Sequence, residues 1–507
     1  MSLWIGIHLP LLALETLRPR WSEPCMLAVL EHDQVLSMTA SAAASGVRPG
    51  MRRGGVLALA PQALLCERDL AREQGARDDI ALTLLQYTPE VAHAEEDSLL
   101  LDVSASLSAF GGRLALCRRI RESIQALGFT PHVSMAPTAQ GAWLLARGMS
   151  RDNSRHAPGL ARQRRSLRLA SMQRRLDALP FMILPAARPY QEWLAGIGCK
   201  TLADLRKLPR AGLQRRSDKH ILESLDRAYG TAPEMFEWVQ APQTFSAWLE
   251  LPDRIEHAEA VLFAARRLIL QMIGWLVAQQ LAVSRFMLSL EHERGRQAIA
   301  PTPLEIALAE PAWHEEHLLR LLKERLGRLQ LDAPVIALRL QASQVAAMLP
   351  PTASLFPEPG GAPGAYARLL ELLSARLGSD NVLQPAAQAD HRPEIANAWQ
   401  AAADSHGSDS GSKRRPPPEE TLRRIQPQRP FWLLQQPLAL MLRQHRPFYG
   451  SPLRLLSGPE RIECGWWDGP AAVRDYFVAE GEEAACYWIY RERHDNDVQW
   501  FLHGLFA

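Results

Sequence analysis

The chain has 507 residues, of which 47% are hydrophobic and 22% are charged, and its formal net charge at pH 7 is +2. This composition excludes an intrinsically disordered protein, and the length allows several folded domains. No uninterrupted apolar stretch approaches the roughly 18 residues of a membrane span, and the first ten residues lack the basic region and cleavage site of a signal peptide.

The six cysteines are scattered along the chain, and none is part of a Cys-x-x-Cys pair. This spacing excludes a zinc ribbon or finger and indicates no disulfide framework. We therefore expect a protein of the reducing cytoplasm that holds no metal or other cofactor.

The first part of the chain alternates short apolar strands with helices. We predict strands at the N-terminus and at 25–30, 34–40, 95–103 and 130–135, and helices at 79–88, 114–127 and 138–147. Such alternation predicts a sheet covered by helices, so we expect an α+β multidomain protein with its first domain over 1–175.

A strongly basic region overlaps the end of this domain. Between Arg113 and Arg227, 22 Lys and Arg residues stand against 8 Asp and Glu. Arginine at this density suits phosphate oxygens and favours salt-dependent binding of nucleic acid, although a solvated helix face is the alternative. The densest part predicts a DNA-binding block made of Arg162, Arg164, Arg165 and Arg168, with Arg174 and Arg175 close behind.

A helical domain is predicted over 176–240, and it contains a Gly-x-Gly turn. Gly196 and Gly198 follow one helix, and Lys200 and Thr201 begin the next. This is the pattern of a helix-hairpin-helix, in which glycines let the backbone approach a phosphate and the next helix offers its N-terminal amides. We expect these four residues to contact DNA; a plain helical turn is the alternative.

The rest of the chain divides into four further segments. Residues 241–345 are predicted in the order strand, helix, strand, strand, helix, strand, which is a split βαβ sandwich. A Pro/Gly-rich segment with a short helix follows at 346–384, then a polar linker at 385–428. Aromatic residues return at 429–507, which predicts a small β-rich module.

The order of these parts resembles the Y-family (translesion) DNA polymerases, with their palm, fingers, thumb and little-finger domains. The resemblance is carried by residues 45–51 for the fingers, by 101–104 with 110–112 for the palm acidic motif, and by 133–138 before the next palm helix. It implies that the thumb-like hairpin, the arginine block and the little-finger-like sandwich would hold DNA.

Polymerases of this family use three carboxylates to hold two divalent metals. The resemblance places those positions at Gly6, Asp97 and Ser98, so one carboxylate of three remains. The nearby His8 is no substitute, because a hard cation such as magnesium prefers oxygen ligands. The resemblance therefore implies a chain without catalytic residues.

The positions that bind the triphosphate in the family are also changed. They fall at Ala40, Ala43 and Trp143, where the family has Tyr, Arg and Lys. The competing hypothesis is an active polymerase whose metal site is rearranged around Glu95, Asp97 and Asp102.

Strings near the C-terminus, at 458–463, 465–469 and 500–507, resemble the non-catalytic, polymerase-like subunits of bacterial mutasomes. This resemblance implies a scaffold in DNA damage-induced mutagenesis with no membrane contact. Its implied partners are primer–template DNA, the sliding clamp, a RecA-like accessory protein of the ImuA type and an error-prone DnaE-type polymerase.

The chain also carries a candidate clamp-binding peptide. Ser354, Leu355 and Phe356 lie in a segment flanked by Pro and Gly, and adjacent apolar side chains on an extended tether can enter a hydrophobic pocket. The Gln that usually opens such peptides is replaced by Thr352. A third hypothesis is a structure-specific DNA-binding module without clamp or polymerase partners.

Overall fold

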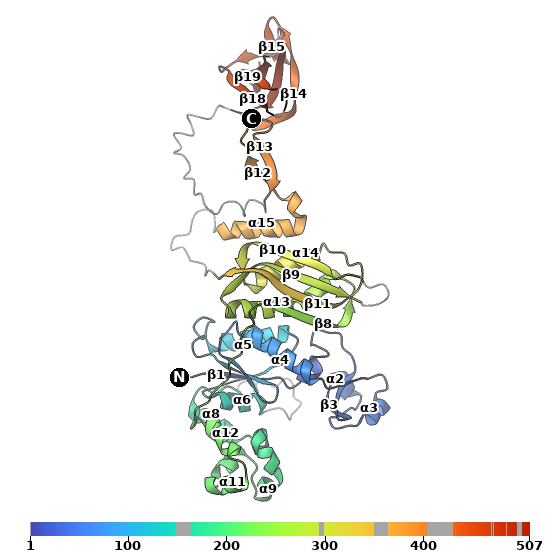
Figure 1. Cartoon of the computed structure of the whole chain (residues 1–507), viewed down its shortest axis with the longest axis vertical. Coiled ribbons are helices and arrows are strands. Elements are labelled where there is room, and N and C mark those ends of the chain that lie inside the picture. The colour runs from blue at the N-terminus through green and yellow to red at the C-terminus, as the bar shows by residue number, and fades with distance from the viewer. Residues whose placement is uncertain are drawn as a thin grey trace. The chain divides into compact units, whose positions relative to one another are not determined.

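The computed structural model describes residues 2–148, 164–293, 299–348, 363–402, 429–467, 469, 471–482, 484–493 and 499–506. The chain forms two compact units, Met1–Arg368 and Leu369–Ala507 (Figure 1). The predicted α+β class is confirmed, because sheets and helices build the first unit and strands predominate in the second. Arg162 and the candidate clamp peptide Ser354–Phe356 lie outside the described residues.

The first unit contains an antiparallel sheet at the position expected for the palm. Its strands, in spatial order, are β5 (Val91–Ala94), β6 (Ser98–Asp102), β1 (Trp4–His8) and β7 (His132–Ala136). Ile5 and Ile7 of β1 share a buried apolar cluster with residues of α4 (Leu70–Leu84) and α5 (Arg113–Ala126). Trp4 belongs to a second cluster with residues of α6 (Ala139–Arg147). Because successive strand residues point to opposite faces, α4 and α5 cover one face of the sheet and α6 covers the other.

The structure differs from the predicted strand at 95–103. Glu96 and Asp97 have positive φ angles of 54° and 52°, so they form the tight turn between β5 and β6. The sequence pattern includes the acidic residues before the apolar run in the strand, whereas β6 begins only at Ser98.

A small sheet lies at the position expected for the fingers. Its strands, in spatial order, are β3 (Gln34–Met38), β2 (Leu27–Glu31) and β4 (Leu64–Glu67), and its helices are α2 (Ala40–Ala44) and α3 (Arg53–Leu59). The short helix α1 (Leu12–Glu15) precedes it.

The thumb-like part is helical and packs on α6. It consists of α8 (Leu169–Asp177), the 3-10 turns η1 (Phe181–Ile183) and η2 (Pro185–Tyr190), α9 (Gln191–Gly196), α10 (Leu202–Lys207), α11 (Arg210–Arg216) and α12 (Lys219–Tyr229). Its buried side chains belong to the same cluster as Trp4. The ring centroids of Trp4 and Phe236 are 4.7 Å apart.

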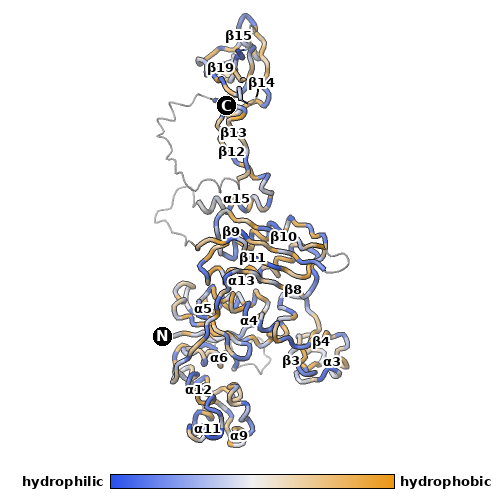
Figure 2. The backbone as a smooth tube through the Cα atoms, in the orientation of Figure 1, coloured by the Kyte–Doolittle hydropathy of each residue, from blue (hydrophilic) through white to orange (hydrophobic). Residues whose placement is uncertain are grey.

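The little-finger-like part has the predicted order of elements. Its sheet runs β10 (Thr302–Ala312), β9 (Leu281–His292), β11 (Val335–Ala347), β8 (Ser246–Ile255), and its helices are α13 (Ala258–Ala278) and α14 (Glu315–Leu326). By length and composition α13 could cross a membrane, but 72% of its most apolar window is buried inside the protein. Apolar residues are frequent along α13 and the strands beside it (Figure 2), so α13 is a core helix.

The second unit is made mostly of strands. After α15 (Pro363–Leu377), which spans the boundary between the units, come η3 (Ser379–Asn381) and the hairpin of β12 (Leu383–Ala387) and β13 (Asn397–Ala401). The larger sheet contains β14 (Trp432–Arg443), β15 (Arg446–Tyr449), β16 (Ser451–Pro452), β17 (Arg454–Leu455), β18 (Glu460–Cys464), β19 (Ala472–Glu480), β20 (Cys486–Glu492) and β21 (Gln499–Leu505). The hairpin corrects the predicted linker, which was expected to begin at residue 385: residues 383–387 pair with residues 397–401 as strands, although neither run has an alternating apolar pattern.

Candidate functional site

The face of the palm-like sheet under α6, called here the α6 face, carries the first position that the resemblance assigns to a metal ligand. Gly6 lies so close to α6 that a Cβ atom would be 2.6 Å from the carbonyl oxygen of Ala142 and 2.8 Å from Oγ of Ser134. Ser134 Oγ donates a hydrogen bond of 2.5 Å to that same carbonyl. The α6 face therefore has no room for a carboxylate side chain at residue 6.

Two histidines and a serine line the neighbouring part of the α6 face. His8 Nδ1 lies 3.1 Å from the carbonyl oxygen of Glu96 and 3.3 Å from Oγ of the fully buried Ser98. Burial lowers the pKa of His8 to about 3, with further lowering from His132, Arg147 and Arg164. Burial and Arg164 lower the pKa of His132 to about 4. Both imidazoles are therefore neutral at pH 7, beside arginines rather than carboxylates.

Asp97, the remaining carboxylate of the predicted set, belongs to the other side of the sheet. Its Oδ1 lies 3.8 Å from Nη1 of Arg77 on α4, which covers the face opposite to α6. Burial raises the pKa of Asp97, and the nearby Glu73 raises it further. Gly6, Asp97 and Ser98 therefore do not converge on one point.

The rearranged metal site of the competing hypothesis is also incompatible with the geometry. Asp97 precedes β6 and Asp102 ends it, so about 16 Å of strand separates them. Asp102 Oδ1 instead accepts hydrogen bonds from the backbone and the hydroxyl of Ser104, at 2.9 and 2.5 Å. Across the described parts of the chain, no three His, Cys, Asp or Glu side chains group closely enough to hold a metal ion. The residues present do not fit the two divalent cations of the polymerase reaction.

Trp143, at the position that the resemblance assigns to a triphosphate-binding lysine, is packed against an arginine. Trp143 Nε1 donates a 3.0 Å hydrogen bond to the carbonyl of Glu95, and the Arg147 guanidinium lies 4.4 Å from the Trp143 ring centroid. Glu96 forms ion pairs with Arg147 and with Arg188 of η2. These contacts join the palm-like sheet to the thumb-like helices. Sequence reasoning missed Glu96, Arg147 and Arg188; the one available signal was an arginine at the end of an otherwise apolar helix.

The fingers positions carry no group that could bind a triphosphate. Ala40 is exposed at the start of α2, and the carbonyl of Ala43 accepts a 2.8 Å hydrogen bond from Arg48 Nη1. Arg48 thus caps the end of α2.

The Gly-x-Gly turn joins α9 to α10 as a hairpin, as predicted. Gly198 has a φ of +83°, and no atom lies within 4 Å of where a Cβ would stand at either glycine. However, the amides of Lys200 and Thr201 already donate to Oδ2 of Asp204, at 3.2 and 3.0 Å. The two amides that were expected to contact a phosphate are thus already bonded to the carboxylate of Asp204. The exposed side chain of Lys200 is the group of this turn that is available to an anion.

The arginine block divides into structural and exposed members. The backbone of Arg164 and Ser166 continues the edge of β7, through hydrogen bonds of 3.1 and 2.8 Å with Met135, and burial lowers the pKa of Arg164. Arg165 is half-buried, whereas Arg168 is exposed before α8. In the described part of the thumb, five exposed basic side chains make no ion pair: Arg174, Lys200, Lys207, Arg215 and Arg216.

Comparison with known proteins agrees with both resemblances. Residues 13–147 match the family model of the impB/mucB/samB family. The chain is 25% identical over 485 residues to Protein ImuB of two Caulobacter vibrioides strains, NA1000 / CB15N and ATCC 19089 / CIP 103742 / CB 15, covering 91% of this chain and 100% of each relative. The expected similarity to the ImuB proteins is confirmed by these two relatives.

Similar solved structures include Dbh DNA polymerase and DinB. An insertion ternary complex of Dbh DNA polymerase is 17% identical, with a TM-score of 0.37, and covers 68% of this chain and 99% of that chain. DinB from Sulfolobus solfataricus is 16% identical, with a TM-score of 0.36, and covers 67% of this chain and 98% of that chain.

Proposed function

We propose that this protein is a non-catalytic scaffold for translesion synthesis in the bacterial DNA-damage (SOS) response, acting in the cytoplasm. It binds primer–template DNA and the sliding clamp, and it recruits an error-prone DnaE-type polymerase together with a RecA-like accessory protein of the ImuA type. The observation that carries the proposal is the α6 face, where Gly6 is closed off by Ala142 and Asp97 points away.

The electrostatics of the α6 face support this proposal. Phosphoryl transfer needs metal ions and cationic groups arranged around the phosphates, with carboxylates to hold the metals. Here Arg147 and Arg188 are paired with Glu96, and both nearby histidines are neutral at pH 7. Among these groups the one carboxylate is that of Glu96, which is already paired with two arginines, so a metal-bound triphosphate would find neither a free carboxylate nor an unpaired cation among them.

DNA binding is assigned to the thumb-like side. The exposed cations Arg174, Lys200, Lys207, Arg215 and Arg216 are available to neutralise phosphates, and Gly196 and Gly198 keep the hairpin turn open. Arg168 extends this surface toward α8, and Arg165 borders it. The proposal therefore expects affinity for primer–template DNA that falls steeply with salt concentration.

The test is a primer-extension assay with magnesium and then manganese, run beside a binding measurement on the same primer–template. We expect no nucleotide incorporation, retained DNA binding and no difference between the wild type and Asp97→Ala. Incorporation that Asp97→Ala abolishes would establish the protein as a polymerase and overturn the proposal.

Clamp binding is assigned to Leu355 and Phe356 and has its own test. The double variant Leu355→Ala/Phe356→Ala should lose capture by the clamp while its DNA affinity is unchanged. A matched control is Leu455→Ala/Leu456→Ala, which removes two exposed leucines from the second unit. Unchanged capture of the first variant would contradict the assignment.

Recruitment of the partner polymerase is assigned to the C-terminal module. Removing 429–507 should abolish damage-induced mutagenesis in cells while the purified protein still binds DNA. If mutagenesis persists at the wild-type level, the alternative of a DNA-binding module without polymerase partners is favoured.

A further inference from the structure

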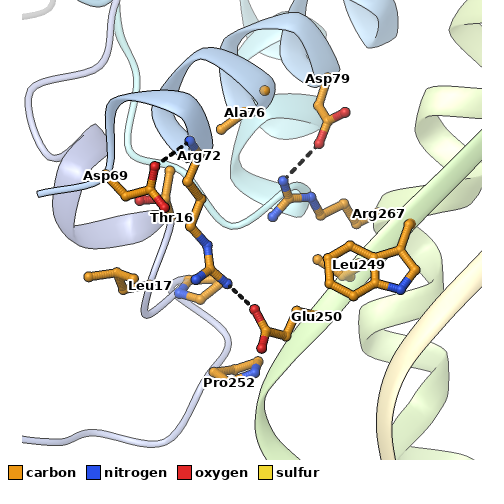
Figure 3. Close-up of a pocket in the computed structure, with 13 residues that line it drawn as sticks. Thr16, Leu17, Asp69, Arg72, Ala76, Asp79, Leu249, Glu250, Pro252 and Arg267 are labelled. Carbon is orange, nitrogen blue, oxygen red and sulfur yellow. Dashed lines mark hydrogen bonds and ion pairs between the residues drawn. The ribbon is translucent and has the colours of Figure 1, made fainter. Parts of the chain in front are cut away.

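The charged side chains that line the cavity between the palm-like and little-finger-like parts are all paired (Figure 3). The cavity has a volume of about 430 Å³ and is lined mainly by residues of α4, β8 and α13. Arg267 lies 3.0 Å from Asp79, and Arg72 lies 2.9 Å from Glu250. Asp69 caps α4 by accepting a hydrogen bond from the backbone amide of Arg72. This cavity therefore offers a ligand no free charge.

The second unit, by contrast, exposes a run of large apolar side chains along strand β14. Trp432 is 71% exposed and Met441 is 63% exposed. Phe431, just before the strand, is 95% exposed, and Leu438 and Leu442 are half-exposed. Because consecutive strand residues point to opposite faces, the exposure of both Met441 and Leu442 leaves β14 uncovered on both faces. These five side chains are called here the β14 surface.

One edge of β14 is uncovered as well. The strand pairs with β21 between Trp432 and Leu440, and with β15, on its other side, only through Met441–Arg443. Within the described ranges, no strand pairs with that other edge before Met441. An apolar strand with a free edge and two uncovered faces is a template for association with another chain. The β14 surface therefore has the character of a docking site.

The charge around the β14 surface is of one sign. Residues 429–459 contain four arginines and no Asp or Glu. Residues 460–507 contain four arginines against ten Asp and Glu, a balance of 4 − 10 = −6. The part of the module that carries β14 thus attracts acidic groups, although the rest of the module is acidic itself.

Two arginines at the end of the β14 surface lack acidic partners. Arg443 of β14 and Arg446 of β15 are exposed, and they lie directly opposite each other in the register of the hairpin. Neither forms an ion pair with another residue that the structure describes, whereas Arg429 and Arg454 pair with carboxylates. Like charges directly opposite each other destabilise a sheet. A carboxylate bound by both guanidiniums would remove this repulsion.

The same observations favour an acidic protein segment over other occupants. A second copy of this chain would bring its own unpaired arginines to the surface, and like charges across an interface oppose association. Single-stranded DNA binds grooves whose cations follow its backbone. No residue from Phe431 to Leu442 is charged, and Arg443 and Arg446 lie together at one end.

We infer that the β14 surface, with Arg443 and Arg446, binds a segment of the partner polymerase that combines apolar with acidic side chains. The apolar side chains of that segment cover Trp432, Leu438 and Met441, and its carboxylates pair with the two arginines. The inference rests on the proposed function for the statement that the C-terminal module recruits a polymerase, and it names the surface that does so.

The test is a binding titration of the full chain with the purified partner polymerase in the absence of DNA. Leu438→Ala/Met441→Ala and Arg443→Glu/Arg446→Glu, the two β14 variants, should each lower the affinity at least tenfold. Because all four side chains are exposed, the denaturant midpoint of each variant should match that of the wild type, which separates loss of docking from loss of the fold.

Two matched controls lie away from β14. Leu455→Ala/Leu456→Ala removes two exposed leucines beside β19, and Lys323→Glu/Arg328→Glu reverses two exposed cations of the first unit. Both controls should bind the polymerase with an affinity within about twofold of that of the wild type.

The remaining outcomes overturn the inference in distinguishable ways. Equal binding by the wild type and the β14 variants would leave recruitment intact but assign it to another surface, whereas no binding by the wild type would overturn recruitment as well. A selective loss of affinity for the RecA-like accessory protein, or for single-stranded DNA, would assign the surface to that ligand instead. A wild-type dimer in sedimentation equilibrium that the β14 variants dissociate would assign it to a second copy.

Discussion

The backbone of Gly6 lies in direct contact with the backbone of Ala142. A Cβ atom at residue 6 would be 2.6 Å from the carbonyl oxygen of Ala142, so only the hydrogen of a glycine fits there. Gly6 therefore does more than replace a metal-binding carboxylate: it also allows the close approach of α6. Because α6 occupies the volume that a side chain at residue 6 would need, the absence of a carboxylate and the position of the helix depend on each other.

Restoring the carboxylate should consequently damage the fold without creating a metal site. We expect Gly6→Asp/Ser98→Glu to incorporate no nucleotide and Gly6→Ala alone to lower the free energy of unfolding by about 1–3 kcal/mol through overpacking. Denaturant unfolding and primer extension measure the two effects. Gly54→Ala, at a glycine with no atom within 4 Å of its Cβ position, is the control, and full stability of Gly6→Ala would contradict the close contact.

The sequence predicts much of this fold and only part of the site. The strand and helix order of the little-finger-like part follows from its periodicity, because long elements such as α13 carry many buried positions. The turn at Glu96 and Asp97 is invisible to periodicity, since two left-handed residues occupy what reads as strand. Likewise, the capture of the Lys200 and Thr201 amides by Asp204 depends on side-chain placement.

Glu96 should stabilise the contact between palm and thumb. Arg147 is 8% exposed, so Glu96→Gln leaves a buried guanidinium without a charged partner, and we expect a loss of about 2 kcal/mol in the free energy of unfolding. Glu95→Gln, at an exposed neighbour, should change stability by less than about 0.5 kcal/mol. Equal losses in the two variants would show that the Glu96 ion pairs contribute nothing.

The buried histidines of the α6 face should make the protein less stable in mild acid. Their pKa values are about 3 for His8 and about 4 for His132, below the ordinary 6.5, so as pH falls the unfolded chain takes up protons that the folded chain does not. Each histidine then lowers the free energy of unfolding by up to about 1.4 kcal/mol per pH unit between pH 6 and 4.5.

The measurement is denaturant unfolding from pH 7.5 to 4.5 for the wild type and His8→Asn/His132→Asn. The variant should show a flatter dependence on pH. Buried carboxylates whose pKa is raised, such as Glu15 and Glu234, act in the opposite direction but are common to both proteins. Parallel curves for the two proteins would contradict the prediction.

Asp204 should limit DNA binding while it stabilises the hairpin. Asp204→Ala removes a capping box at α10, which we expect to cost about 1 kcal/mol of stability. It also frees the two amides beside Lys200 and removes a negative charge, so DNA affinity at low salt should rise about threefold. Asp218→Ala, which removes the cap of α12, should lose similar stability without that gain in affinity. Weaker DNA binding by Asp204→Ala would show that the capped turn itself is the DNA-binding form.

The β12–β13 hairpin should behave as part of the C-terminal module. Arg474 of β19 pairs with Glu394 of the hairpin loop at 2.8 Å. A Cβ atom at Gly465 would lie 2.7 Å from Nη1 of Arg392, so the Arg392 guanidinium is packed directly against this glycine. Gly465 also has a φ of +87°, so Gly465→Ala strains the backbone and displaces Arg392. Amide hydrogen exchange of the full chain should then be at least tenfold faster in β12 and β13, while Gly458→Ala, at an open position, leaves it unchanged. Unchanged exchange in Gly465→Ala would mean that the hairpin is held by its own pairing, and the module would then begin at β14.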